Sequence, residues 1–359
     1  MTFKEGFVFI ARCLSAHIIK ENYQEVKQQI ESENVDWDLV VQISTSQLVF
    51  PALYINLLKT NLTALLPQDL LAYMEHITQL NRDRNEQIIT EANHLHQIAM
   101  ENNIKLVFLK GTSYLLSGLY EDIGERMIGD IDFLVDENEA LKINSILIKN
   151  GYKDPKNICS SRPDFRHLPR LIHDDYLAAI EIHTQVTIQK YLPDFHPEKL
   201  IHTAVEINKT FHLTASIALK TAAITHQINS NGNQYKSFSL RNAYDLLLLD
   251  AKYKPSLAPY KNHALHKIVS HYEHMINSIF KANIKLVDKN EIKISEQQIQ
   301  RNIENYKKTK NKKTLYWFSN NSARLKIAFK TIYDPTYRNH ALKKLSSKEF
   351  YISLFKLKI

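Results

Sequence analysis

The stretch Gly129-Asp130-Ile131-Asp132-Phe133-Leu134-Val135 decides the fold that we expect for the centre of this chain. Its second half is apolar, the pattern of a short buried strand. Side chains alternate along a strand, so Asp130 and Asp132 share one face and their apolar neighbours occupy the other. Like-charged carboxylates this close repel each other, and a divalent cation such as Mg²⁺, which takes carboxylate oxygens as ligands, removes that repulsion. The stretch therefore predicts a strand that binds a metal ion.

The sequence around this strand predicts an α+β fold: a small mixed-sheet core at residues 86–190, an N-terminal helical region at 1–85 and a C-terminal helical, basic region at 191–359. Apolar spacing and Gly, Pro and Asn positions set the expected elements. They are helices at Asp69–Gln79, Asn85–Asn102, Ser113–Tyr120 and Glu137–Asn150, strands at Ile104–Leu109 and Asp130–Val135, a hairpin with arms His167–His173 and Tyr176–Thr187 that turns at Asp174-Asp175, and helix from Pro193 onward.

Composition bounds the class of protein. The 359 residues are 44% hydrophobic and 23% charged, which predicts an ordinary globular chain of two or three units. Seven glycines are few, so helices should dominate. Cys13 and Cys159 are too few for a disulfide framework or a four-cysteine zinc site, which favours buried thiols and a cytoplasmic location. We expect neither a signal peptide at the N-terminus nor a transmembrane segment.

The positive charge is concentrated near the C-terminus. Residues 281–359 hold 19 Lys or Arg against 6 Asp or Glu, although the whole chain carries a net charge of +8. The lysines of residues 306–313, beside Tyr316 and Trp317, could follow a nucleic-acid backbone, but a solvated loop is the favoured interpretation. The aromatic and basic residues 350–359 could lie on a membrane surface, but a terminal helix docked on the protein is favoured.

A third carboxylate occurs in Ala179-Ile180-Glu181-Ile182-His183. In a strand, Glu181 and His183 share one face and the two isoleucines occupy the other. If this strand lies beside that of Asp130, Glu181 completes a cluster of three acids that can hold two Mg²⁺ ions. His183 would then be either a ligand or a residue that orients a ligand.

Two further features are candidates for binding phosphate. Lys110-Gly111-Thr112 follows a predicted strand and opens a helix, so its backbone N–H groups and the Thr112 hydroxyl could face an anion. Gly111 would let a triphosphate approach the backbone closely, and Lys110 would add a positive charge. Arg126, four residues before Asp130, is placed either to fork onto a phosphate or to brace the carboxylates.

Each of these features has an ordinary structural interpretation when taken singly. The aspartate pair could be charges at a strand edge, Glu181 a salt-bridge partner, Arg126 a surface cation and Lys110-Gly111 a simple turn. Their combination in this order favours a functional site. Arg241 and Asp245, by contrast, have the i, i+4 spacing of a helix salt bridge, which we favour over a substrate contact.

The series of Lys110-Gly111, Arg126, the aspartate pair and Glu181-Ile182-His183 resembles the uncharacterised nucleotidyltransferase family, within the DNA polymerase β-like nucleotidyltransferase superfamily. The resemblance covers roughly residues 80–250. It implies a short mixed sheet with helices, two Mg²⁺ ions, and transfer of a nucleoside monophosphate from NTP with release of pyrophosphate. This chain differs from the superfamily in having Lys-Gly-Thr in place of the usual Gly-Ser turn.

By position, the resemblance implies that Asp130, Asp132 and Glu181 bind the metal ions and act in catalysis, and that Gly111 and Thr112 occupy the phosphate turn. We therefore expect a Mg²⁺-dependent nucleotidyltransferase whose acceptor is a small molecule, a protein or an RNA. The alternative is a catalytically degenerate module of the same fold that binds nucleotide or a partner.

Overall fold

The computed structural model describes residues 1–155, 166–288, 294–307, 331–332 and 334–345. Its centre is a five-stranded sheet with the strand order β3-β2-β1-β5-β4. Neighbouring strands are parallel in the pairs β2–β3 and β1–β5 and antiparallel in β1–β2 and β4–β5. The predicted α+β class with a small mixed sheet is therefore confirmed. The strands are β1 (Val107–Phe108), β2 (Asp130–Leu134), β3 (Ala179–His183), β4 (Val205–Ile207) and β5 (Thr210–His212).

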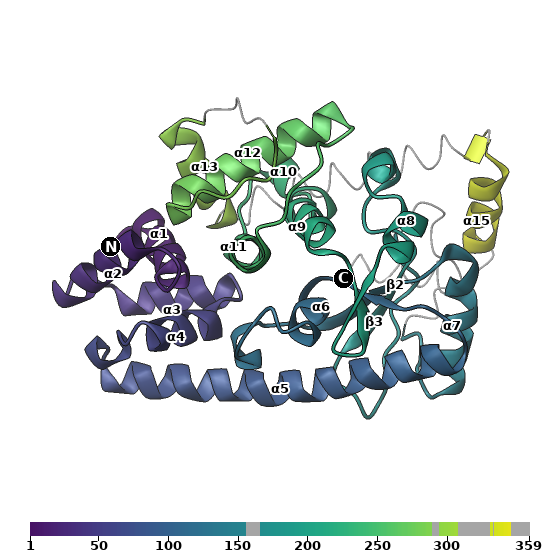
Figure 1. The fold of residues 1–359 in the computed structure, drawn as a ribbon, viewed down its shortest axis with the longest axis horizontal. Helices are drawn as coiled ribbons and strands as arrows, with labels where there is room; N and C mark the ends of the chain where they lie inside the picture. The colour runs from purple at the N-terminus through teal and green to yellow at the C-terminus, as the bar shows by residue number, and fades with distance from the viewer. Residues whose placement is uncertain (156–165, 289–293, 308–330, 333, 346–359) are drawn as a thin grey trace.

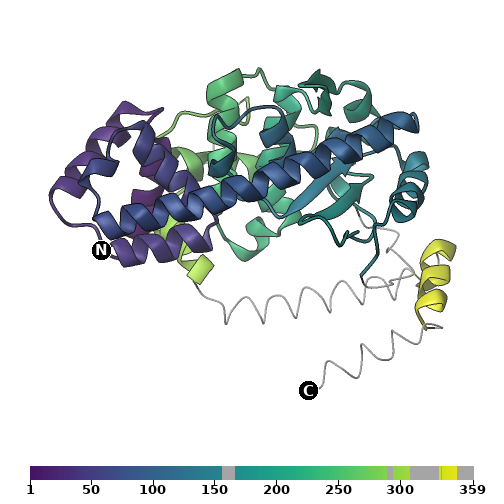
Figure 2. The ribbon, with the colours of Figure 1, turned by 90° about the horizontal axis from the view of Figure 1, so that it is seen from below.

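Helices precede and follow the sheet in the chain. A long helix, α5 (Gln68–Glu101), runs along one side of the molecule from the N-terminal helices to the sheet, as Figures 1 and 2 show. The N-terminal helices share one apolar core with α5, and of these helices the one at Phe50–Lys59 packs on it. They are α1 (Phe3–Ser15), α2 (Lys20–Glu31), α3 (Trp37–Ser46), α4 (Phe50–Lys59) and the short 3₁₀ helix η1 (Thr63–Leu65).

The prediction of two separate helices at Asp69–Gln79 and Asn85–Asn102 is wrong, because α5 is continuous. The polar residues between them do not break the helix, since neither Gly nor Pro occurs there. They bind the loop before β2 instead. Asn81 Nδ2 donates to the Gly124 carbonyl at 2.7 Å, and Arg82 holds Asp122 with two hydrogen bonds.

The elements around β1 are shorter or shifted from their predicted positions. Only two residues of the predicted strand Ile104–Leu109 are paired as a strand. The helix expected at Ser113–Tyr120 is α6 (Lys110–Leu116), which begins directly after β1. The prediction of a helix at Glu137–Asn150 agrees with α7 (Glu137–Lys149), and the 3₁₀ helix η2 (Ile123–Glu125) lies in the loop before β2.

The predicted hairpin exists with shorter strand pairing. Its turn lies at Asp174-Asp175, as predicted, but the paired part of the second arm is only Ala179–His183. The first arm makes isolated antiparallel bridges, His167 to His183 and Leu171 to Ile180. This arm therefore covers the outer edge of β3, whose backbone N–H and C=O groups would otherwise be open to pairing with another chain.

The prediction of continuous helix from Pro193 is wrong, because β4 and β5 form a hairpin within that region. Asn208 and Lys209 both adopt positive φ, of 50° and 64°, as a two-residue hairpin turn of type I′ demands. The other elements that the structure describes in this region are helical. They are η3 (Gln189–Asp194), α8 (Pro197–His202), α9 (Ala215–Ile224), the π-helix η4 (Thr225–Asn229), α10 (Gly232–Tyr235), α11 (Leu240–Tyr253), α12 (His263–Phe280), α13 (Glu296–Lys307) and α15 (Pro335–Leu345).

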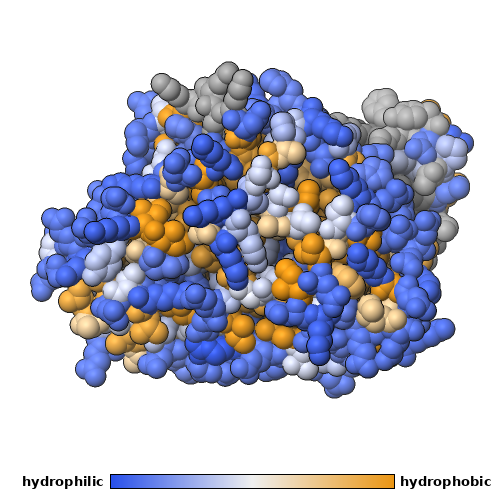
Figure 3. All heavy atoms as spheres, viewed as in Figure 1, coloured by the Kyte–Doolittle hydropathy of each residue, from blue (hydrophilic) through white to orange (hydrophobic). Residues whose placement is uncertain are grey.

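The region boundaries at residues 85 and 190 remain a prediction. Cys159 and the tail segments 308–317 and 350–359 lie outside the described residues, whereas Cys13 is a buried free thiol. Among the described residues, no single helix is long and apolar enough to span a membrane; α3 and α4 pass that test only as a pair bent by 120°. On the face seen in Figure 3, hydrophobic residues lie in small patches among hydrophilic ones.

Candidate active site

The pairing of β2 with β3 brings two of the three predicted acids, Asp132 and Glu181, together, whereas Asp130 lies outside the group of atoms that could share one metal ion. The two strands are parallel, and Asp132 lies directly opposite Glu181 while Asp130 lies opposite Ala179. Paired residues project to the same face of a sheet, so both carboxylates leave the sheet side by side. One donor atom each from Asp132, Glu181 and His183 falls within 4.8 Å of the others. All three residues are buried, with 7%, 6% and 0% of their surface exposed.

His183 is held so that its imidazole faces the two carboxylates. Its Nε2 lies 2.8 Å from Asp132 Oδ1 and 3.3 Å from Glu181 Oε2. Its Nδ1 lies 3.4 Å from the Gln185 carbonyl oxygen. A ring whose second nitrogen meets a backbone carbonyl is oriented in the way that metal-binding and carboxylate-orienting histidines are.

Lys110 places its ammonium against the same carboxylates. Its Nζ lies 2.5 Å from Asp132 Oδ1 and 3.8 Å from Glu181 Oε2. The backbone of Lys110 has a φ of 51°, the left-handed conformation that a residue with a β-carbon rarely adopts. Such strained residues cluster at functional sites. The ammonium therefore supplies positive charge at the head of α6, next to the acids.

Arg170, on the first arm of the hairpin, contacts the other side of the cluster. Its Nε donates to Glu181 Oε1 at 2.6 Å, and its Nη2 lies 3.1 Å from Asp130 Oδ2. The Arg170 side chain is 52% exposed, whereas the Glu181 side chain is 8% exposed. Two cations and an imidazole thus surround three carboxylates.

Burial and these neighbours shift the pKa values of the acids in opposite directions. Burial raises the pKa of Asp130, and the nearby Glu181 and Asp132 carboxylates act the same way, while Arg170 opposes them. Burial also acts to raise the pKa of Glu181, but hydrogen bonds from His183 and the charge of Lys110 outweigh it and lower that pKa. Glu181 is therefore held as a carboxylate, the form that binds a cation.

The turn at Gly111 and Thr112 packs closely against β2 and the loop before it. A β-carbon on Gly111 would lie 2.4 Å from Ile128 Cγ2, so only glycine fits. The Thr112 hydroxyl donates to the Asp130 carbonyl at 3.1 Å, and the Leu109 N–H donates to the Asp132 carbonyl at 2.9 Å. These bonds tie the start of α6 to the strand that carries the aspartates.

Arg126 is buried and bound to Asp245 of α11. Its Nε and Nη2 donate to the two Asp245 oxygens at 2.7 and 2.8 Å, and its Nη1 donates to the Met127 carbonyl at 2.6 Å. The Tyr120 hydroxyl donates to the same carboxylate at 2.5 Å. Both Asp245 oxygens are thus held by Arg126. They are not held by Arg241, the helix partner that we favoured from the sequence.

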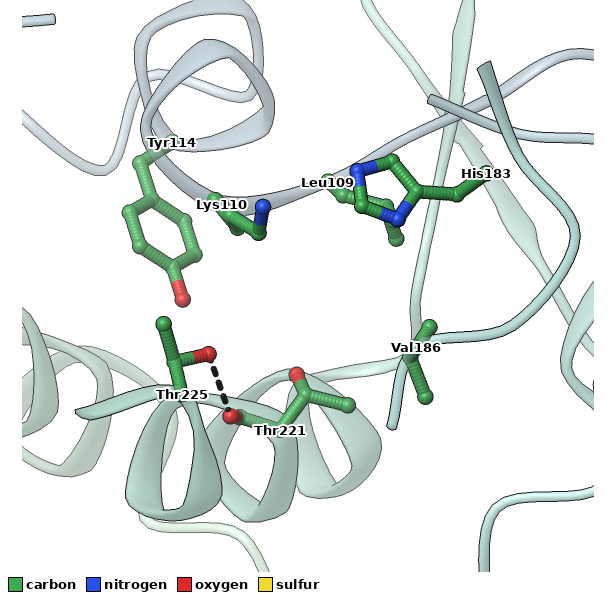
Figure 4. A pocket seen from close by; sticks show the side chains of 7 residues that line it. All are labelled: Leu109, Lys110, Tyr114, His183, Val186, Thr221 and Thr225. Atoms are coloured by element: carbon green, nitrogen blue, oxygen red, sulfur yellow. Dashed lines mark hydrogen bonds between the residues drawn. The ribbon is translucent and has the colours of Figure 1, made fainter. Parts of the chain in front are cut away.

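A small pocket lies beside Lys110 and His183 (Figure 4). These two side chains line one wall of the pocket, and Thr221 and Thr225 of the helical segment α9–η4 line the opposite wall. Its cavity of about 10 Å³ has room for roughly one water molecule. The pocket lies between the sheet and the C-terminal helices, and it is lined by Lys110 and His183 but by none of the three carboxylates.

A family model described as uncharacterised nucleotidyltransferase matches residues 33–265. This match spans more than half of the 359 residues. The chain belongs to the uncharacterised nucleotidyltransferase family. No curated protein and no solved structure matches it. The matched residues of this nucleotidyltransferase family member include every acid and cation described above, from Lys110 to Asp245.

Three residues of this nucleotidyltransferase family member, Arg166, Arg170 and Asp245, have surroundings that its sequence did not predict. Arg170 belongs to the predicted hairpin arm His167–His173 and Arg166 directly precedes it, but neither was predicted to lie near the acids, and Asp245 was predicted to pair with Arg241. A signal for the arginines exists, because residues four apart on an extended arm share one face. No local signal points to Asp245, since it lies 119 positions after Arg126 in the chain.

Proposed function

We propose that this protein is a Mg²⁺-dependent nucleotidyltransferase that transfers a nucleoside monophosphate from NTP to a hydroxyl group. The observation that carries the proposal is the register of β2 with β3, which sets Asp132 opposite Glu181 with His183 within ligand distance of both. Membership of the nucleotidyltransferase family supports the reaction class. The acceptor that we propose is a small molecule, a protein or an RNA.

The donor set fits a divalent cation. Asp130, Asp132 and Glu181 offer carboxylate oxygens, which Mg²⁺ prefers, and the lowered pKa of Glu181 keeps that group ionised. We propose that these acids hold two ions, with His183 as a ligand or as the residue that orients Asp132. The bound ions would activate the acceptor oxygen and neutralise charge on the phosphates.

In the reaction, the acceptor oxygen forms a bond to the α-phosphorus of NTP while the bond to the bridging oxygen of pyrophosphate breaks. Pyrophosphate leaves with that electron pair, and the acceptor hydroxyl gives up its proton to solvent. Catalysis of this kind consists mainly of positioning and electrostatic stabilisation. In our proposal the Lys110 ammonium neutralises phosphate charge, and the backbone at Gly111 and Thr112 faces the phosphates at the start of α6.

We propose that Arg126 acts by bracing the backbone of the loop before β2, and not by binding a phosphate. All three of its side-chain nitrogens already donate to Asp245 or to the Met127 carbonyl. It therefore fastens the loop before β2 to α11, and this loop leads directly to Asp130. We propose that this brace keeps the aspartates in register with Glu181.

The direct experiment incubates the protein with Mg²⁺, labelled NTPs and pools of candidate acceptors, and screens for the mass shift of a nucleoside monophosphate. The Asp130→Ala/Asp132→Ala variant is the comparison. Transfer by the wild-type protein and none by the variant is the expected result. Equal nucleotide binding and turnover in the two proteins would refute the assignment.

The second candidate is a catalytically degenerate module that binds nucleotide or a partner. The observation that favours it is the pairing of Lys110 and Arg170 with the acids, which offsets two of the three carboxylate charges without a metal ion. Calorimetry with ATP separates the two candidates. ATP binding that is the same with Mg²⁺ and with a chelator favours the module, whereas binding that needs Mg²⁺ favours the enzyme.

Two further parts of the proposal rest on the sequence. The cytoplasm is the compartment that we propose, because two cysteines in 359 residues suit a reducing environment. RNA binding through the basic C-terminal region stays the less favoured option. An affinity for tRNA that does not fall with rising salt would exclude a phosphate-backbone contact.

A further inference from the structure

Arg170 occupies carboxylate oxygens that the proposed function assigns to a metal ion. Its Nε and Nη2 both lie 2.6 Å from Glu181 Oε1, and Nη2 also lies 3.1 Å from Asp130 Oδ2. The second oxygen of Glu181, Oε2, faces His183 and Lys110. A cation that binds Glu181 Oε1 and Asp130 Oδ2 must therefore compete with this guanidinium.

The position of Arg170 allows such an exchange. Backbone hydrogen bonds hold its arm to β3, as from Leu168 to the Ile182 carbonyl, but the Arg170 side chain itself is 52% exposed. The guanidinium can therefore move from the acids into water, and a divalent ion that takes its place keeps the buried Glu181 carboxylate paired. A guanidinium forms two-point hydrogen bonds with phosphate as well as with carboxylate, so one side chain suits both partners.

We propose that Arg170 and the divalent ion compete for Asp130 and Glu181, and that the displaced guanidinium binds the phosphates of the donor nucleotide. This inference rests on the proposed function, since it assumes that a nucleotide and a metal ion meet at these acids. It adds a residue that the family resemblance does not assign. Arg170 then couples metal binding to nucleotide binding.

Arg166, four residues before Arg170 and directly before that arm, supports a phosphate site there. Its Nη1 is buried and has no hydrogen-bond partner among the residues that the structure describes. Burial lowers the pKa of Arg166, and the Glu181 and Asp132 carboxylates oppose this shift. A buried donor beside the acids is costly unless a partner satisfies it, and a phosphate oxygen is such a partner. Arg166 and Arg170 therefore offer two guanidinium groups near the acids.

Two titrations test the proposal, each with wild-type protein and Arg170→Gln. The first measures Mn²⁺ affinity without nucleotide by electron paramagnetic resonance, and the second measures ATP affinity in Mg²⁺ by calorimetry. Arg170→Gln should bind Mn²⁺ about 3- to 10-fold more tightly, because the competing cation is gone, and ATP about 10-fold more weakly.

Lys153→Gln is the matched control. Like Arg170→Gln, this substitution removes one positive charge that pairs with a carboxylate. The Lys153 side chain is 60% exposed, however, and its partner is Asp174 on the turn of the hairpin instead of one of the three acids. It should change both affinities by less than about twofold. In an Asp130→Asn background, Arg170→Gln should gain less Mn²⁺ affinity than in the wild-type protein, because one contested carboxylate is neutral.

The outcomes separate this inference from the proposed function. If Arg170→Gln binds Mn²⁺ with the same affinity as the wild-type protein, or more weakly, the competition is overturned. The metal site itself still stands in that case. Unchanged ATP affinity overturns the phosphate role of Arg170. A failure of both proteins to bind Mn²⁺ overturns the metal site itself, and the inference with it.

Discussion

Asp132 of β2 and Glu181 of β3 lie directly opposite each other on adjacent parallel strands, although 48 residues separate them in the chain. Their carboxylates meet at His183, which lies within hydrogen-bond distance of both. Pairing of two buried acids is unfavourable unless cations or proton donors surround them. The cluster of Asp130, Asp132, Glu181 and His183 with Lys110 and Arg170 meets that condition.

Asp132→Asn and Glu181→Gln should each lower the rate of nucleotidyl transfer by about 10²-fold to 10³-fold, because each removes a charge that the proposed ions need. The double variant should lose little more than either single variant, since residues that act as one unit are not additive. Rates with labelled NTP check this. Asp175→Asn, whose side chain is 86% exposed on the turn of the same hairpin, is the control. Losses that multiply would show that the two acids act separately.

Arg126→Met should destabilise the protein by about 3–5 kcal/mol, because it leaves Asp245 buried without its charge partner. Arg82→Met is a matched control. Arg82 also binds a carboxylate through two hydrogen bonds, to Asp122, but both side chains are about 30% exposed, so the loss should be about 1 kcal/mol or less. Chemical denaturation measures both. Equal losses would mean that burial does not govern the Arg126 pair.

Gly111→Ala should cost about 1–3 kcal/mol, because the new methyl group would meet Ile128 Cγ2 at 2.4 Å. Ile128→Ala removes that atom, so the double variant should lose less stability than the sum of the single variants. Gly129→Ala is the control. Among the described residues, no atom beyond its chain neighbours lies within 4 Å of the new β-carbon, so the change should stay within about 0.5 kcal/mol. Additive losses in the double variant would rule out the contact with Ile128.

Glu91 should make stability depend on pH. Its Oε1 accepts a hydrogen bond from the Tyr152 hydroxyl, whereas Oε2 has no hydrogen-bond partner within the described part of the chain. Burial raises the pKa of Glu91 from 4.5 to about 7. The folded protein therefore retains a proton that the unfolded chain releases, so this stability is complete below pH 4.5 and is lost as the pH rises through 7.

Thermal unfolding between pH 5 and 8 measures this contribution. The wild-type protein should lose roughly 2–3 kcal/mol over that range through Glu91, and Glu91→Gln should remove most of the loss because the amide carries no proton that titrates. Glu86→Gln, an exposed position on the same helix, should keep the wild-type profile. A pH profile that Glu91→Gln leaves unchanged would contradict the raised pKa.

Local patterns were sufficient where a short segment determines its own structure. The alternation in Asp130–Val135 predicted the strand and its acidic face, and Asp174-Asp175 predicted the turn of the hairpin. Local patterns failed where breakers are absent or the elements are very short. The α5 helix passes through a polar segment, and the β4 strand has only three residues, although Asn208-Lys209 is a turn signal that could have marked the hairpin.

The sequence by itself determined which residue types are available at the site: two aspartates on one strand face, a glutamate and a histidine on another, and a lysine and a glycine at a turn. The tertiary structure alone decided their partners. It set Asp132 opposite Glu181, placed Arg170 on Asp130 and Glu181, and paired Arg126 with Asp245. Side-chain alternation follows from the geometry of one strand, whereas strand register and ion pairing between distant segments follow from how the whole core packs.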